Sequence, residues 1–233
     1  MSSPPTREAS RPGAVVDWFL LLGLGAVAGT YVRAMAFTPA ERLQGLAQKI
    51  FYIHLPSALM AFLAFFVVAV AGGMYLWLRD ERLDRVAESS AEVGVMFTTV
   101  VLITGPLWGK PVWGTWWTWD ARLTLTLFLW FVYVGYLVMR GALDDRAQRA
   151  RFSAVLGILG SLLIPFIHLS VYMFRTLHPQ PIVLKPSAPS LPGEMLTTLI
   201  IAFASFTLLY VGLVRARYRL GVLHDRDTLD GDS

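Results

Sequence analysis

The strongest metal-ligating side chains of this 233-residue sequence are its four histidines, His54, His168, His178 and His224. The sequence contains no cysteine, which excludes disulfides, thiolate metal sites and a thiol redox relay. Two neutral imidazoles that face one another from neighbouring helices can bind a haem iron from both sides. The histidines therefore raise the question of which two lie close enough to act as a pair.

A second group with chemical potential is a dense cluster of tryptophans. Five of the eight tryptophans lie within twelve positions, at Trp108, Trp113, Trp116, Trp117 and Trp119. One or two tryptophans would indicate only the aromatic belt of a membrane interface. Five are too many for a belt, and flat indole rings can line the faces of a planar, hydrophobic macrocycle. We therefore predict that residues 108–119 form a ligand-binding loop.

The elements that position these residues are expected to be membrane helices. Hydrophobic residues make up 55% of the chain, charged residues only 15%, and the mean hydropathy is +0.56. A helix crossing about 30 Å of hydrocarbon needs about 20 apolar residues. Apolar runs that can serve as such helices occur at about 15–37, 50–78, 93–108, 123–139, 152–174 and 193–214. The sequence therefore predicts an all-α integral membrane protein with six transmembrane helices.

The predicted domain organisation is a disordered tail over 1–14, a six-helix domain over 15–214 and a second tail over 215–233. Within the first helix, Gly25 and Gly29 form a GxxxG pair, which either permits close helix approach or reflects chance. Pro56 and Pro165 lie near His54 and His168 and are expected to bend their helices.

Basic residues indicate the orientation of the helices. Thirteen of the twenty lysines and arginines lie in the two tails and in the connectors near 79–85 and 140–151. The positive-inside rule therefore predicts that both termini are cytoplasmic and that loops 38–49, 109–122 and 175–192 are periplasmic. The basic residues flank apolar runs and do not form one stripe, so we expect membrane lipid and not nucleic acid as a partner.

This topology brings His54 and His168 to a similar shallow depth beneath the outer surface. An ionisable side chain in a spanning helix is costly and suggests a function. The alternative is that each histidine only hydrogen-bonds a neighbouring helix. His178 is interpreted as a solvated loop residue, or as a residue that supports the ligand-binding side chains or takes part transiently in ligand transfer. The sequence assigns no role to His224.

Asp120 and Arg122 follow the tryptophan cluster at the start of the fourth predicted helix. Asp120 is either a helix N-cap or a member of the ligand site. Arg122 can pair with a haem propionate, with Asp120 or with a lipid phosphate. The same anion-binding role is open to other basic residues of the outer side, namely Arg33, Arg42, Lys49 and Arg175.

Residues 113–124, which read WGTWWTWDARLT, resemble the tryptophan-rich WWD signature of haem-handling proteins of cytochrome c biogenesis. Within that superfamily, six helices with one histidine before and one after the signature resemble the CcmC family, haem exporter protein C of system I maturation. Residues 53–57 and 167–171 add weaker support. The related CcmF and CcsA types are larger than this chain.

The resemblance implies a haem-delivery protein of the bacterial inner (cytoplasmic) membrane. By this resemblance, His54 and His168 bind the iron of a transiently held haem b, and the signature loop shelters the ring. The implied site residues of that loop are Trp113, Trp116, Trp117, Trp119, Asp120 and Arg122. The implied partners are the periplasmic haem chaperone CcmE, the ABC transporter subunits CcmA and CcmB, and the small membrane protein CcmD.

Two alternative functions are also compatible with a membrane protein that binds haem. A b-type haem subunit for electron transfer would require stacked histidine pairs nearer the membrane centre, whereas one shallow pair is available here. A haem permease would require polar or broken segments through the midplane, and the inner halves of the helices offer little beyond Glu92. The sequence contains no convincing catalytic set and no phosphate-binding loop, so we expect a protein that is not an enzyme.

Overall fold

The computed structural model describes residues 17–180, 182, 185, 187 and 190–231. The predicted disordered tail over 1–14 lies outside these residues. The described helices are α1 (Trp18–Ala36), η1 (Leu46–Ile50), α2 (Phe51–Leu78), α3 (Glu81–Trp113), α4 (Ala121–Ala142), α5 (Arg146–Ser161), α6 (Leu163–Met173) and α7 (Gly193–Gly231). Six spans within the described residues are long and apolar enough to cross a membrane, which confirms the predicted fold class.

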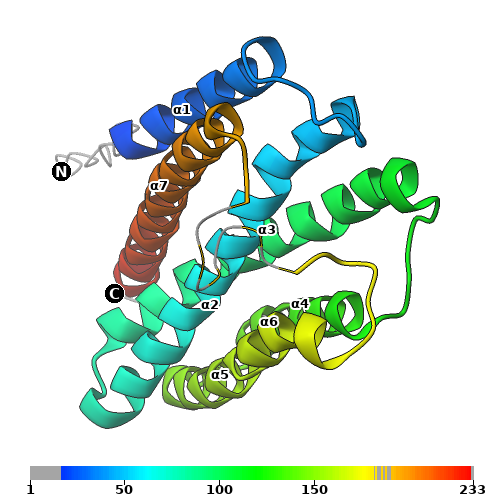
Figure 1. The fold of residues 1–233 in the computed structure, drawn as a ribbon. Coiled ribbons are helices and arrows are strands. Elements are labelled where there is room, and N and C mark those ends of the chain that lie inside the picture. Colours follow the sequence, from blue (N-terminus) through cyan, green and yellow to red (C-terminus); the bar gives the residue numbers. More distant parts are fainter. Residues whose placement is uncertain (1–16, 181, 183–184, 186, 188–189, 232–233) are drawn as a thin grey trace, which may run out of the picture.

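The long helices α2 and α3 form the centre of the bundle (Figure 1). Helices α1 and α7 pair on one side of this centre, and α4, α5 and α6 lie on the other. The main core joins both sides through buried residues such as Phe65, Val68, Phe97 and Tyr133. Phe65 of α2 stacks on Tyr133 of α4 with ring centroids 3.7 Å apart. Apolar packing across α2 therefore connects the two sides.

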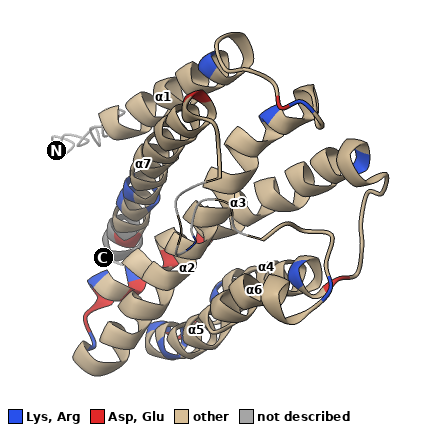
Figure 2. Ribbon diagram, in the orientation of Figure 1, with Lys and Arg blue, Asp and Glu red and all other residues tan. Residues whose placement is uncertain are grey.

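Aspartates fix where four of the helices begin. Asp17, Asp80, Asp120 and Asp145 each precede a helix and accept a hydrogen bond from a backbone N–H of its first turn. Such side chains satisfy donors that have no partner within the helix. Charged residues therefore collect around helix ends, while most of the spanning length carries none (Figure 2).

Two helices are longer than hydropathy predicts. The sequence pattern places a helix over 93–108, but α3 runs from Glu81 to Trp113, and α7 continues to Gly231 instead of ending at 214. The added segments are held together by ion pairs between helices, such as Arg85–Asp225, Arg217–Glu92 and Arg140–Asp84. The charged stretches are therefore helical and not connectors, and the tail predicted from residue 215 continues α7 as far as Gly231.

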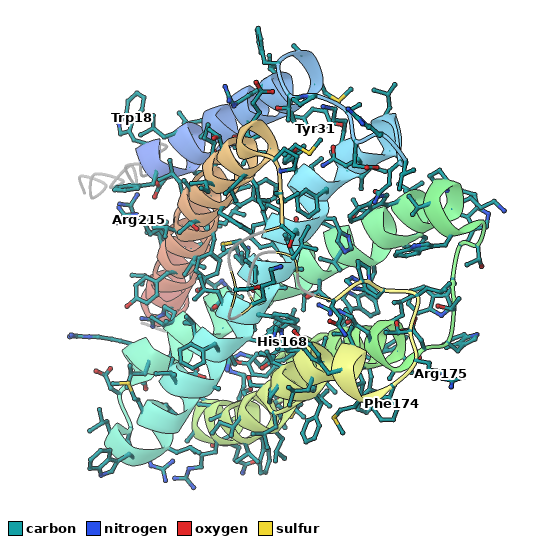
Figure 3. All side chains as sticks on the ribbon, in the orientation of Figure 1. Trp18, Tyr31, His168, Phe174, Arg175 and Arg215 are labelled. Carbon is teal, nitrogen blue, oxygen red and sulfur yellow. The ribbon has the colours of Figure 1, made fainter. Side chains whose placement is uncertain are left out.

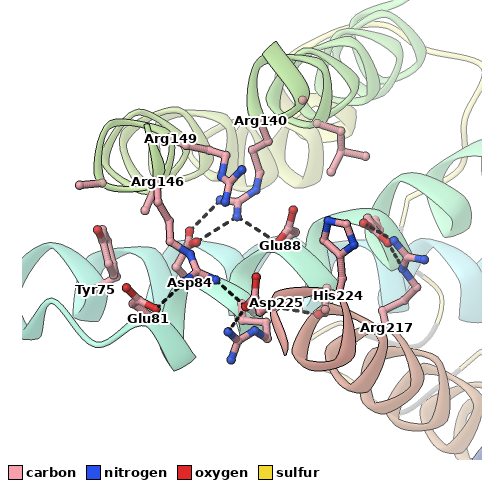
Figure 4. A pocket seen from close by; sticks show the side chains of 18 of the residues that line it. Tyr75, Glu81, Asp84, Glu88, Arg140, Arg146, Arg149, Arg217, His224 and Asp225 are labelled. Atoms are coloured by element: carbon pink, nitrogen blue, oxygen red, sulfur yellow. Dashed lines mark hydrogen bonds and ion pairs between the residues drawn. The ribbon is translucent and has the colours of Figure 1, made fainter. Parts of the chain in front are cut away.

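These ion pairs surround a polar cavity of about 1060 Å³ at the end of the bundle where α3 and α5 begin (Figure 4). Arg140 of α4 lines this cavity. The guanidinium donates to both oxygens of Asp84, at 2.7 and 2.9 Å, and lies 3.0 Å from Glu88 Oε2. Only 4% of the Arg140 side chain is exposed. The bidentate pair therefore ties α4 to α3.

The fifth predicted span is one apolar segment but two helices, because α5 ends at Ser161 and α6 begins at Leu163. Pro165 has no backbone N–H to donate to the carbonyl of Ser161, and its ring crowds that carbonyl. The prediction of a distortion near His168 is therefore confirmed. Pro56, in contrast, lies inside α2 without interrupting that helix.

The close contact between α1 and α7 depends on glycines other than the GxxxG pair. A Cβ atom at Gly25 or Gly29 would meet no atom within 4 Å. A Cβ at Gly23 would lie 2.6 Å from the Leu209 Cα, and one at Gly212 would lie 2.6 Å from the Leu20 Cα. The close helix approach therefore does not involve Gly25 or Gly29 but occurs at Gly23 of α1, two residues before Gly25, and at Gly212 of α7.

We predict that Gly23→Val or Gly212→Val destabilises the protein by about 1–3 kcal/mol, because a backbone atom of the facing helix must move. Gly25→Val and Gly29→Val are matched controls, since both make the same change in α1 where space is open. Unfolding midpoints in detergent measure the difference. Equal midpoints for the four variants would show that α1 and α7 do not need this contact.

Candidate functional site

A cavity of about 520 Å³ lies at the opposite end of the bundle, where α2 and α4 begin and α3 and α6 end. Its volume falls within the range of about 300–1,000 Å³ that is usual for small-molecule sites. Most of its wall is aliphatic or aromatic, and the polar exceptions include His54, His168, His178 and Arg122. The structure thus brings together both histidines that the sequence predicts as a pair.

His54 and His168 reach the cavity from different parts of the bundle. His54 lies in the first turns of α2, and its Nδ1 is 2.9 Å from Thr104 Oγ1 of α3. Its ring meets Trp108 edge-on, with centroids 5.8 Å apart. His168 projects from α6 on the side that faces α2 (Figure 3). Its ring lies 6.4 Å from that of Tyr172.

His178 lines the same cavity and is half-buried, so the interpretation as a freely solvated residue is wrong. Its ring lies 6.5 Å from Trp113, and Nδ1 donates a hydrogen bond of 3.0 Å to the Pro179 carbonyl. Burial, followed by the positive charge of Arg122, lowers the pKa of His178 to about 4. At neutral pH the ring is therefore neutral, and Nε2, which has no hydrogen-bond partner among the described residues, can accept a hydrogen bond or bind a metal.

The tryptophan cluster is only partly a loop. Helix α3 continues to Trp113 and ends at Gly114, which has φ +76° and donates its N–H to the Lys110 carbonyl at 3.0 Å. A glycine with positive φ is the usual end of a helix, so Gly114 is the sequence signal for this boundary. The predicted loop over 108–119 is therefore a helix end followed by a connector over 114–120.

Four of the five tryptophans line the cavity, namely Trp108, Trp113, Trp116 and Trp117. Trp119 is not part of the wall; it is 77% exposed and packs edge-on against Trp117, with centroids 5.8 Å apart. Trp116 is also 56% exposed while touching the cavity. The cluster therefore has an inner group against the cavity and an outer edge that faces away from it.

Two buried donors at the cavity have no hydrogen-bond partner among the described residues. They are Nη1 of Arg122 and Nε1 of Trp117. Buried donors are nearly always hydrogen-bonded, so unpaired ones at a cavity suggest that a ligand supplies the acceptor. A carboxylate suits a guanidinium best. Apolar walls, histidine nitrogens and a free guanidinium together fit haem, whose ring is apolar and whose edge carries propionates.

The structure brings fewer anion-binding residues to the cavity than the sequence suggests. Lys49 is buried and donates to the carbonyls of Thr38 and Pro39, and Arg33 donates to Thr198 Oγ1 at 3.2 Å. Arg42 and Arg175 are exposed, and Figure 3 shows Arg175 beyond the end of α6. Arg122 is therefore the one member of this group that lines the cavity within the described residues.

Asp120 is the N-cap of α4, which is one of the two roles that the sequence predicts for this residue. Its Oδ1 accepts from the Leu123 N–H at 3.1 Å, and its Oδ2 accepts from Thr118 Oγ1 at 3.0 Å. Asp120 is not part of the cavity wall, although its charge acts on Arg122 and His178. Its contribution to the site is to fix the start of α4, and with it the position of Arg122.

Two further residues support the site without any prominent sequence signal. Gln44 accepts a hydrogen bond of 2.9 Å from Trp108 Nε1 and thereby holds that ring beside His54. Thr104 lies four residues before Trp108 on α3, so both face His54. A threonine in an apolar run is too common for its position to reveal this role. The spacing to Trp108 is the one available signal.

Comparisons with known proteins identify the family. The family model described as "Heme exporter protein C" (CcmC) matches residues 2–230. The chain is 37% identical over 206 residues to "Heme exporter protein C" of Haemophilus influenzae, covering 88% of this chain and 82% of the relative. It is 37% identical over 224 residues to that of Bradyrhizobium diazoefficiens, covering 95% and 84%.

A relative outside the bacteria is the "Putative cytochrome c biosynthesis ccmC-like mitochondrial protein" of Marchantia polymorpha, which is 35% identical over 168 residues, 72% of this chain and 71% of the relative. With its six spans and its bacterial relatives, the chain is a multi-pass protein of the bacterial inner membrane. The family match extends over nearly the whole chain. The chain thus belongs to the CcmC family, heme exporter protein C.

Proposed function

We propose that the protein binds haem b transiently in the 520 Å³ cavity and presents it to the periplasmic chaperone CcmE for cytochrome c maturation. The observation that carries this proposal is that His54 of α2 and His168 of α6 line one apolar cavity with four tryptophans. In the proposed complex the two imidazoles bind the iron from opposite faces. The family name supports haem as the cargo.

The other residues of the cavity have separate roles in this proposal. The rings of Trp108, Trp113, Trp116 and Trp117 exclude water from the macrocycle and pack against it. Arg122 pairs with a propionate through the Nη1 that lacks a protein partner. Bound haem supplies the iron that the histidines bind, and the protein contributes orientation and shelter. We propose no catalytic role for the chain and no ATP hydrolysis.

The orientation of the cavity is also part of the proposal. The distribution of lysine and arginine supports cytoplasmic termini, with the cavity end of the bundle in the periplasm. The exposed rings of Trp116 and Trp119 then form a surface that a periplasmic chaperone can contact beside the haem. The ABC transporter subunits CcmA and CcmB and the small protein CcmD complete the proposed assembly, and this part rests on the family resemblance alone.

Haem transfer to purified CcmE tests the proposal. We expect the triple variant Trp116→Ala, Trp117→Ala, Trp119→Ala to insert in the membrane normally but to load the chaperone at a small fraction of the wild-type rate. The matched control is Trp18→Ala with Trp77→Ala, which removes two exposed tryptophans that do not line the cavity. Wild-type loading by the triple variant would show that these tryptophans only anchor the protein at the membrane interface and have no role in haem transfer. A reversible haem potential without transfer would favour an electron-transfer subunit.

A further inference from the structure

We propose that Thr104 is a positioning residue for haem: its hydroxyl holds His54 in the Nδ1-protonated tautomer, which makes Nε2 the iron-binding nitrogen. We infer further that His54 is the fixed ligand and His168 the exchangeable one. This inference rests on the proposed function, because it assigns a role in the same cavity. It depends on the direction of two hydrogen bonds and on a difference between the surroundings of the two histidines.

The direction of the hydrogen bonds follows from the single proton of a hydroxyl group. Thr104 Oγ1 lies 2.7 Å from the Val100 carbonyl oxygen, which can only accept. The Thr104 proton is therefore donated along α3 to Val100. Toward His54 Nδ1, at 2.9 Å, the same oxygen can then only accept. Nδ1 must carry the ring proton, and a neutral imidazole then has its lone pair on Nε2.

The rest of the pocket fixes the plane of the His54 ring. Trp108 meets the ring edge-on, and Gln44 in turn holds Trp108 through the indole N–H. Gly105 packs beside this ring, since a Cβ added there would lie 3.5 Å from Cε1, at ordinary van der Waals distance. Within the described residues, Nε2 of His54 has no hydrogen-bond partner, and His54 lines the cavity. Its lone pair is thus available to a ligand in the cavity.

His168 lacks comparable support. No hydrogen bond to its ring nitrogens is found in the part of the chain that the structure describes, and the aromatic ring beside it, 6.4 Å away, belongs to the exposed Tyr172. Its helix, α6, has 11 residues and is separated from α5 by the break at Leu162. An outer hydrogen bond fixes the orientation of a ligating histidine and raises its basicity, so His54 is the better-held ligand.

The tautomer can be tested directly in the protein without haem. In protein labelled with ¹⁵N-histidine, we expect the imidazole ¹⁵N shifts to report a protonated Nδ1 and an unprotonated Nε2 for His54. The His54 signals are identified by their absence in His54→Asn. The Thr104→Val variant, which keeps the shape but loses the acceptor, should show a mixture of tautomers. A protonated Nε2 in the wild-type protein would overturn the proposal.

Haem titration tests the consequence. Loss of such an outer partner typically weakens metal binding by about 10–100-fold, and we expect this for Thr104→Val together with an altered Soret band. Thr104→Ser keeps the hydroxyl and should behave as wild type. Thr207→Val is the matched control, because the Thr207 hydroxyl donates to the Phe203 carbonyl of its own helix and Thr207 does not line the cavity. A Thr104→Ser variant as weak as Thr104→Val would show that packing, and not the hydroxyl, matters.

The two histidines should differ in the same titration. We expect His54→Ala to lower haem affinity at least several-fold more than His168→Ala, and added cyanide to replace His168 first. Equal losses in the two variants would overturn the assignment of fixed and exchangeable ligands. If no variant and no wild-type protein binds haem, the proposed function fails, whereas the ¹⁵N result for His54 and Thr104 stands on its own.

Discussion

Replacing His54 or His168 with glycine should remove most of the haem from the purified protein and change the Soret band of the remainder. Each substitution deletes a proposed iron ligand, so its effect should exceed the about 10–100-fold loss that follows removal of a partner behind a ligand. The absorption spectrum of the protein after saturation with haem and removal of the excess measures this loss. Unchanged spectra in both variants would contradict the assignment of axial ligands.

Added imidazole separates loss of a ligand from loss of the fold. It can occupy the space left by the histidine side chain and should restore part of the bound haem in His54→Gly and His168→Gly. His224→Gly is the matched control, because His224 lines the polar cavity at the other end of the bundle. Failure of imidazole to restore binding in either variant would indicate that the histidines support the structure and not the iron.

Replacing Arg140 with alanine should cause the largest loss of stability. The buried guanidinium satisfies Asp84 with two hydrogen bonds and contacts Glu88 and the Tyr136 ring (Figure 4). Removing one partner of a buried ion pair costs about 3–5 kcal/mol, and the Asp84 carboxylate left without its partner is only 13% exposed. Thermal unfolding in detergent measures this change. The expected order of stability is wild type above Arg140→Lys, which loses the bidentate geometry, above Arg140→Ala.

Two further variants define the cause of that loss. Arg146→Ala removes a guanidinium that is 45% exposed and paired with Glu81 and Asp225, and such exposed pairs contribute at most about 1 kcal/mol. The double variant Arg140→Met, Asp84→Leu removes both buried charges and should recover much of the stability. If the double variant is as unstable as Arg140→Ala, the loss comes from packing and not from an unpaired charge.

Hydropathy predicts the spans well but not the ends of the helices. The apolar lengths are visible in the sequence, and six of them match helices or helix pairs in the structure. The charged segments 81–92 and 215–225 are helical because Asp80 caps α3 and because arginines of one helix pair with acids of another. Such pairs depend on which helices are neighbours, and that information is absent from a hydropathy pattern.

The candidate site was predictable to the extent that it depends on topology. His54 and His168 were expected at the same end of the bundle, and both line one cavity there. The role of Thr104 depends on which face of α3 meets α2, and one apolar sequence does not specify that face. The same limit explains why the sequence did not identify the glycine of α1 that contacts α7. Gly23 and Gly25 are alike in sequence, but only Gly23 faces α7 closely.

The break at Leu162 affects how His168 is positioned in the site. His168 lies about one and a half turns before the end of α6 at Met173, and the chain then leads directly to the exposed residues Phe174 and Arg175. Because the helical hydrogen-bond pattern is interrupted at Leu162, α6 is a short helix that packs mainly on α4. The two histidines of the cavity are therefore carried by separately packed helices, and a substitution in the contact between α4 and α6 would move His168 relative to His54.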